Sequence, residues 1–206
     1  MAGILDLLGP ALSGGSLQDL SRSVGTDEQT TQRAMMAALP VILGAMQRNN
    51  SNAQQAQSLA HALERDHDGS LLDNLGGFLG KRGGGSGSAP SVNPKATDGG
   101  GILGHIFGNN LNRVEQGVGQ ATGMNTQQVT KLLMMAAPLV MAYLGRQKRQ
   151  QNLDAGGLSD LLQRESQKAR QAAPPDLLGT IGSFLDRDGD GSPIDDVLGG
   201  LLGGRR

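Results

Sequence analysis

Hydrophobic residues recur at helical spacing along this chain, and two long apolar stretches dominate the pattern. Residues 34–46 and 132–144 are apolar at nearly every position, and each stretch contains one proline, Pro40 or Pro138. Each stretch is about 13 residues long, short of the ~20 needed to cross a bilayer. Because a helix that is apolar on all faces is normally buried, we expect two central helices that pack against each other.

Capping signals indicate where these two helices begin and end. Thr26 or Asp27 is placed to cap the first helix, which is expected to run to about Arg48. Asn125 takes the capping position of the second helix, and Gly145 is expected to mark its end. An interior proline costs a helix roughly 3 kcal/mol, so two such prolines predict bends that serve packing.

The two helices belong to a longer internal repeat. Many residues recur at an offset of 98 positions, among them the pairs Gly25 and Gly123, Pro40 and Pro138, and Arg48 and Arg146. Self-similarity at one fixed offset is typical of duplicated units. The sequence therefore predicts an all-α, orthogonal helical array built from two internally duplicated helical units.

A Gly/Ser/Pro-rich stretch separates the two units. Residues 83–88 read GGGSGS, and Pro90 and Pro94 follow, a composition typical of flexible linkers. We expect a first unit over 1–80, a linker over 81–100, a second unit over 101–150 and a helical extension over 151–206. Composition leaves open whether the two units form one pseudo-symmetric domain or two domains.

Composition narrows the functional classes. Aromatic residues make up 2% of the chain, so the core must consist of Leu, Ala, Val, Ile and Met, which suits helix packing. A net charge of −1 and the scarcity of aromatic platforms argue against nucleic-acid binding. The absence of Cys excludes disulfides and thiolate metal sites. No basic segment precedes the first apolar residues, so we expect a cytoplasmic protein without a membrane span.

The densest group of candidate metal ligands is the run 186–196, which reads DRDGDGSPIDD. An EF-hand loop takes oxygen ligands from positions 1, 3, 5, 7 and 12 and has Gly at position 6. The candidate calcium ligands here are Asp186, Asp188, Asp190, the carbonyl of Ser192, and Asp195 or Asp196. Val197 stands where the closing Glu belongs, so we expect weak binding, and weaker still at the similar run 64–74.

Turn chemistry offers an interpretation of both runs that requires no metal. Ser192 is followed by Pro193 and, at the third helical position, by Asp195, which is typical of a capped helix start. Residues 70–73 repeat this arrangement. Three carboxylates within five residues repel one another unless something neutralises them, and this repulsion favours the calcium interpretation for 186–196.

Two resemblances extend these observations. The Asp-x-Asp-x-Asp-Gly run at 186–191 resembles the EF-hand and its shortened bacterial relatives. Residues 100–108, 114–118 and 132–145, with the central Pro138, resemble a bacterial family numbered 937 among domains of unknown function, related to the YidB-like helical proteins. That second resemblance spans roughly residues 30–150. It implies an all-helical array and carries no assigned activity.

The sequence offers weaker evidence for a histidine metal site or a catalytic site. His61 and His67 flank Glu64, so a zinc or iron site is conceivable, but a surface histidine beside a loop is commoner. His105 is expected at an apolar-flanked structural position. No motif for a nucleophile or a phosphate loop stands out, which argues against an enzyme.

Methionine supports a second hypothesis. The two central helices carry Met35, Met36, Met46, Met134, Met135 and Met141. Methionine fills gaps in an aromatic-poor core, and Met-rich surfaces also adapt to many partners. We therefore expect a non-catalytic bacterial protein that binds calcium weakly through 186–196. The alternative is a metal-independent interaction or oligomerisation module that uses the Met-rich kinked helices.

Overall fold

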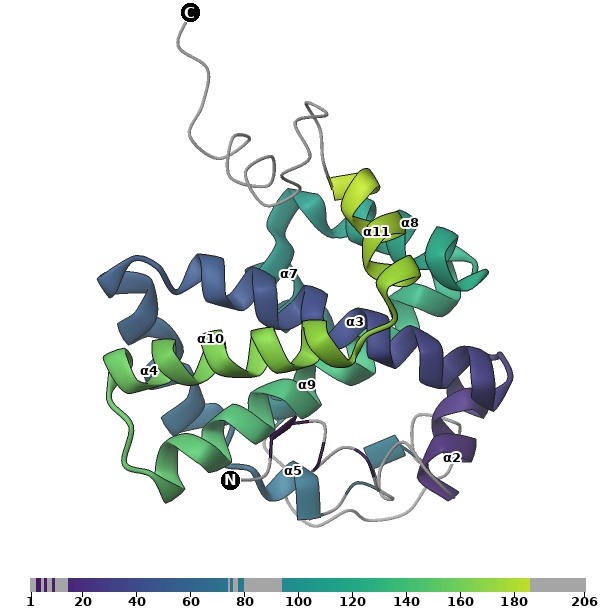
Figure 1. Cartoon of the computed structure of the whole chain (residues 1–206). Coiled ribbons are helices and arrows are strands. Elements are labelled where there is room, and N and C mark those ends of the chain that lie inside the picture. The colour runs from purple at the N-terminus through teal and green to yellow at the C-terminus, as the bar shows by residue number, and fades with distance from the viewer. Residues whose placement is uncertain are drawn as a thin grey trace, which may run out of the picture.

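The computed structural model describes residues 3, 4, 6, 9, 15–73, 75, 78, 79 and 94–185. All regular structure in these residues is helical, which confirms the predicted all-α class (Figure 1). The α-helices are α2 (Gly15–Val24), α3 (Glu28–Asn49), α4 (Ala53–Asp66), α5 (Ser70–Asp73), α7 (Gly99–Phe107), α8 (Leu111–Thr122), α9 (Thr126–Gln150), α10 (Ala155–Ala172) and α11 (Pro175–Leu185). Two 3-10 helices, η2 (Pro94–Thr97) and η3 (Gly108–Asn110), flank α7.

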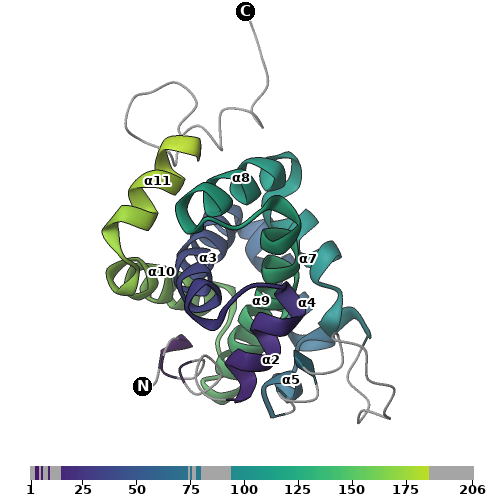
Figure 2. The ribbon, with the colours of Figure 1, turned by 90° about the vertical axis from the view of Figure 1, so that its right-hand side faces the viewer.

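The predicted central helices are α3 and α9, and they pack against each other in the middle of the molecule (Figure 2). Pro40 and Pro138 lie inside them, and both prolines are buried. α10 packs along α3, whereas α4, α5 and α7 pack on α9. α11 packs along α8. The expectation of two buried central helices that pack against each other is confirmed.

The caps of the central helices follow the sequence signals closely. The Asp27 carboxylate accepts a hydrogen bond from the backbone N–H of Thr30 (2.8 Å), so Asp27 and not Thr26 caps α3. Asn125 caps α9 in a reciprocal box with Gln128, in which both hydrogen bonds measure 3.0 Å. Each cap satisfies backbone N–H groups that have no partner within the helix.

The prediction that Gly145 ends the second helix is wrong, because α9 continues to Gln150. The reason for glycine here is close packing. A Cβ at this position would lie 1.7 Å from the carbonyl oxygen of His67, at the end of α4. Gly145 therefore allows the backbone of α4 to approach α9 directly.

The methionines of the central helices fill the core. Met35, Met46, Met135 and Met141 are buried, and Met36 and Met134 are half-buried. This confirms their expected role as gap fillers between helices that contain few aromatic residues. Among the described residues, α9 is the one helix long and apolar enough to span a membrane, and 78% of its most apolar window is buried inside the protein.

The two predicted units share one hydrophobic core. Buried residues from Ile4 to Ile181 form a single cluster, and α10, from the predicted extension, packs mainly on α3 of the first unit. The last residues of the predicted linker 81–100 belong to the folded core, since η2 begins at Pro94, Ala96 is buried, and α7 begins at Gly99. Residues 81–93 lie outside the described residues.

Several local features recur at the offset of 98 residues. α2 ends at Val24 and α8 at Thr122, and each helix is followed by a glycine with positive φ, Gly25 (85°) and Gly123 (77°). This left-handed conformation at a helix end is the one that glycine adopts without strain. The duplication itself stays a prediction.

Candidate functional site

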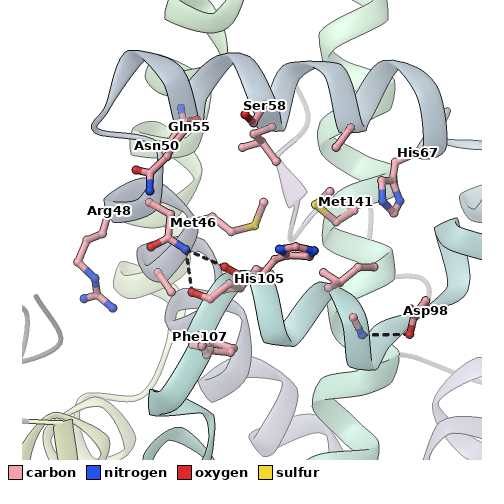
Figure 3. A pocket seen from close by; sticks show the side chains of 18 of the residues that line it. Met46, Arg48, Asn50, Gln55, Ser58, His67, Asp98, His105, Phe107 and Met141 are labelled. Atoms are coloured by element: carbon pink, nitrogen blue, oxygen red, sulfur yellow. Dashed lines mark hydrogen bonds between the residues drawn. The ribbon is translucent and has the colours of Figure 1, made fainter. Parts of the chain in front are cut away.

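A groove with a volume of about 980 Å³ opens between α4 and α7, and we call it the α4–α7 groove (Figure 3). The carboxyl-terminal halves of α3 and α9 contribute to its floor, and η2, η3 and the start of α8 line its ends. Its apolar lining consists mainly of Met46, Leu59, Ile102, Ile106, Phe107 and Met141. Met46 and Met141 come from the two proline-containing helices and are buried, so these helices form the bottom of the groove.

The charged residues of the α4–α7 groove are unevenly paired. Asp66 accepts an ion pair from Arg65 (2.7 Å), and Asp98 caps α7 by accepting from the backbone N–H of Gly101 (3.0 Å). Two further arginines, Arg48 and Arg113, have no carboxylate within 4.0 Å in the part of the chain that the structure describes. The carboxylates of the groove thus have partners, whereas its guanidinium groups at Arg48 and Arg113 have no counter-ion among the described residues.

Arg48 is the more constrained of these two arginines. Its side chain is half-buried, and burial together with the nearby Arg170 lowers the pKa of its guanidinium. Arginine nevertheless remains protonated in proteins. A partly desolvated positive charge close to a second one is unfavourable unless an anion approaches. The position of Arg48 therefore favours a negatively charged ligand.

The two histidines of the groove reverse the sequence expectations. His67, expected as a surface residue, is 5% exposed, and its Nδ1 atom is buried without a hydrogen-bond partner in the described structure. Burial lowers the pKa of His67, which keeps the imidazole neutral at neutral pH. His105, expected at a structural position, is exposed on α7. Both side chains lie in the space between α4 and α7 (Figure 3).

Two asparagines join α3 to the neighbouring helices at one end of the groove. The Asn49 amide donates to the carbonyls of His105 (3.3 Å) and Ile106 (2.8 Å). The Asn50 amide donates to the Ser159 hydroxyl (2.6 Å), and its Oδ1 atom is buried without a hydrogen-bond partner among the described residues. Together with His67 Nδ1, this leaves two buried polar atoms in groove-lining residues that a ligand or water could satisfy.

The carboxylates of the acidic run 64–74 bind other groups of the same chain. Glu64 pairs with Lys148 (2.6 Å), Asp66 with Arg65, Asp68 with the backbone N–H of Ser70 (3.0 Å), and Asp73 with Arg146. The hydrogen bond from Lys148 lowers the pKa of Glu64. No group of three or more His, Asp or Glu residues able to hold a metal occurs among the described residues. The run therefore serves here as a turn and a helix start that are fastened to α9.

The basic end of the second central helix holds this run in place, because Arg146 and Lys148 both bind its carboxylates. The predicted calcium ligands Asp186, Asp188, Asp190, Ser192, Asp195 and Asp196 lie outside the described residues. Calcium binding at 186–196 thus stays a prediction.

Comparison with known proteins places the chain in a family without giving it an activity. A family model described as "Bacterial protein of unknown function (DUF937)" matches residues 6–147. Every residue that lines the α4–α7 groove lies within this range, whereas α10 and α11 lie beyond it. No curated protein and no solved structure matches the chain. The match covers more than half of the 206 residues, and the chain therefore belongs to the family of bacterial proteins of unknown function DUF937.

Proposed function

We propose that this chain is a non-catalytic binding module whose α4–α7 groove receives an acidic, amphipathic segment of a protein partner. One observation carries the proposal. The groove combines an apolar floor with two arginines, Arg48 and Arg113, that no carboxylate of the described residues neutralises.

The chemistry of the lining supports an acidic, amphipathic partner. An amphipathic helix binds a groove by placing apolar side chains at i, i+3, i+4 and i+7 against its floor. Here Met46, Met141 and Leu59 would contact these side chains, and methionine adapts its shape to varied partners. Arginine pairs with carboxylates through two parallel hydrogen bonds, so Arg48 and Arg113 would select Glu or Asp on the partner.

In this proposal the partner contacts only the part of the methionine-rich helices that lines the α4–α7 groove. Met35, Met46, Met135 and Met141 are all buried, but Met46 and Met141 lie at the bottom of the groove, whereas the other two do not line it. A partner would therefore contact α3 and α9 through the groove and not along their whole length.

A fluorescence-anisotropy titration tests the proposal. The probe is a labelled synthetic peptide of about four helical turns with Leu at i, i+3, i+4 and i+7 and Glu at the remaining positions. We expect saturable binding that weakens as salt is added, because charge pairs near a surface are screened. A hydrogen bond to a charged group contributes ~1.5–3 kcal/mol, so Arg48→Glu with Arg113→Glu should weaken binding by at least about tenfold.

The matched control reverses two positive charges outside the groove, Lys131→Glu with Arg149→Glu. Both residues are exposed on α9, and neither lines the groove. Equal loss of affinity in the two double variants would mean that only net charge matters. Binding that never saturates would likewise overturn the proposal.

We also propose that residues 186–196 bind calcium weakly, because three carboxylates stand in EF-hand spacing there. Calorimetric titration of calcium into the full chain, with Asp188→Ala as the control, tests this part. Heat that saturates in the parent and disappears in the variant would support it, and no heat at millimolar calcium would end it. A cytoplasmic location remains part of the proposal, although a site this weak suits extracellular calcium at about 10⁻⁴–10⁻³ M.

A further inference from the structure

We infer that the α4–α7 groove is regulated by the chain itself, through its residues 186–202, which we call the C-terminal acidic segment. This inference rests on the proposed function of the groove and names its first occupant. In this account the segment binds the groove of its own chain and competes with any external partner.

The segment has the chemistry that the groove lacks. Its first part carries five aspartates, Asp186, Asp188, Asp190, Asp195 and Asp196, against one arginine, Arg187. Its second part is apolar, with Val197, Leu198, Leu201 and Leu202 separated by glycines. The groove offers two arginines without a carboxylate partner among the described residues beside an apolar floor. The aspartates of the segment would therefore pair with the two arginines, and its apolar residues would contact the apolar floor of the groove.

The point at which the segment begins favours binding within one chain. α11 ends at Leu185 and packs along α8, and α8 carries Arg113 at one end of the groove (Figure 1). α8 has 12 residues and is thus about 18 Å long, whereas 17 extended residues reach about 55 Å. A segment attached this close has an effective concentration in the millimolar range, which makes even weak contacts competitive.

The chain already contains one contact of this kind. The short acidic and apolar stretch that begins with α5 docks on α9, with Leu71 and Leu72 buried and Asp73 paired to Arg146. At the offset of 98 residues, the counterpart of Arg146 in α3 is Arg48. Arg48 has no such carboxylate in the described residues, and the C-terminal acidic segment would supply it.

The sequence of α11 resembles that of residues 70–79 but lacks the carboxylate that corresponds to Asp73. α11 repeats the order of apolar residues of that stretch, with Leu177, Leu178 and Ile181 at the places of Leu71, Leu72 and Leu75. At the place of Asp73, however, α11 has Gly179. The carboxylate that fastens the first stretch is thus missing from α11, and the next carboxylates along the chain are those of the C-terminal acidic segment.

Disulfide trapping tests the inference directly, because the chain has no cysteine of its own. One cysteine replaces Leu198 in the segment, and the other replaces Ser58, an exposed residue of α4 that lines the groove. The control pair combines the same Leu198→Cys with Gln120→Cys, an exposed position on α8 outside the groove. Each full-length variant is equilibrated with glutathione in the presence of a calcium chelator, and the disulfide is quantified by mass spectrometry.

We expect the groove pair to show an effective molarity at least about tenfold above that of the control pair. This excess should disappear when Arg48→Glu and Arg113→Glu are added. Equal effective molarities for the two pairs would overturn the inference. A disulfide that joins two chains and not one would overturn it as well.

A second measurement separates this inference from the proposed function. Replacing the five aspartates of the segment by asparagine alters none of the described residues. The designed peptide should then bind the full-length variant at least about threefold more tightly, because its competitor is weakened. Arginine-dependent binding of unchanged affinity would leave the proposed function in place and overturn the inference. Loss of all peptide binding would remove the basis of both.

Discussion

Gly145 provides the most quantitative test of how the groove is built. A Cβ at this position would lie 1.7 Å from the carbonyl oxygen of His67 and 3.0 Å from its carbonyl carbon. Ordinary contacts of a Cβ begin at 3.4 Å, so Gly145→Ala requires α4 and α9 to separate by more than 1 Å. The obstacle is backbone, and no side-chain rotation can relieve it.

Two opposing terms set the size of the effect. Alanine in place of glycine inside a helix contributes about 1 kcal/mol of stability through backbone entropy. Overpacking a well-filled contact costs about 1–3 kcal/mol, and a clash with backbone lies at the upper end of that range. We therefore expect Gly145→Ala to lower the free energy of unfolding by about 2 kcal/mol. For a chain of this size the melting temperature should fall by about 4–8 °C.

Urea unfolding followed by circular dichroism measures this change, with the slope of the transition checked for two-state behaviour. Gly104→Ala is the matched control, because Gly104 lies inside α7 and a Cβ there would meet nothing within 4 Å. The control should gain up to about 1 kcal/mol. If Gly145→Ala is as stable as Gly104→Ala, the direct approach of α4 to α9 does not exist in solution, and the wall of the groove is misplaced.

Two further predictions concern single groups in and around this region. Because burial lowers the pKa of His67, the unfolded chain binds the extra proton below about pH 6.5, and stability should fall as the pH drops from 7 to 5. His67→Gln should lose less stability than the parent over this interval in urea titrations at each pH, and parallel losses would contradict the buried position. Asn125→Ala removes the cap of α9 and should cost about 1 kcal/mol, whereas an unchanged melting temperature would show that the cap contributes nothing.

The features that sequence predicted well are those encoded locally. The two central helices follow from uninterrupted apolar runs, and their caps follow from Asp27 and Asn125, whose side chains bond N–H groups three residues ahead. The methionine core follows from the scarcity of aromatic residues. All of these depend on neighbours in the chain, which periodicity and capping rules describe.

The features that sequence missed depend on which helices meet. The role of Gly145 arises only because the end of α4 presses on α9. Similarly, Arg146 and Lys148 find carboxylates that lie more than 70 residues away in the chain. The α4–α7 groove combines residues from both halves, so no local motif could have predicted it. Arg146 pairs with Asp73, whereas Arg48 has no carboxylate partner in the described residues. This difference depends on tertiary contacts, which local sequence does not encode.

Two stretches near the carboxyl end of the chain resemble the run that α5 begins. Residues 186–196 match 64–74 at an offset of 122, with Arg, Asp, Gly and Ser at corresponding positions, whereas α11 repeats the apolar residues of 70–79 at an offset of 106. The carboxylates of 64–74 bind partners among the described residues, and calcium binding at 186–196 stays a prediction.

The central claim, that the α4–α7 groove is the binding site of this protein, is tested most directly by mapping where the designed acidic peptide binds. Amide chemical shifts of the full ¹⁵N-labelled chain are compared by NMR before and after the peptide is added. We predict that the large changes fall within residues 45–67 and 95–113, which face each other across the groove, together with Met141. Changes that cluster instead on α2 or on the exposed face of α10, with α4 and α7 unaffected, would contradict the claim.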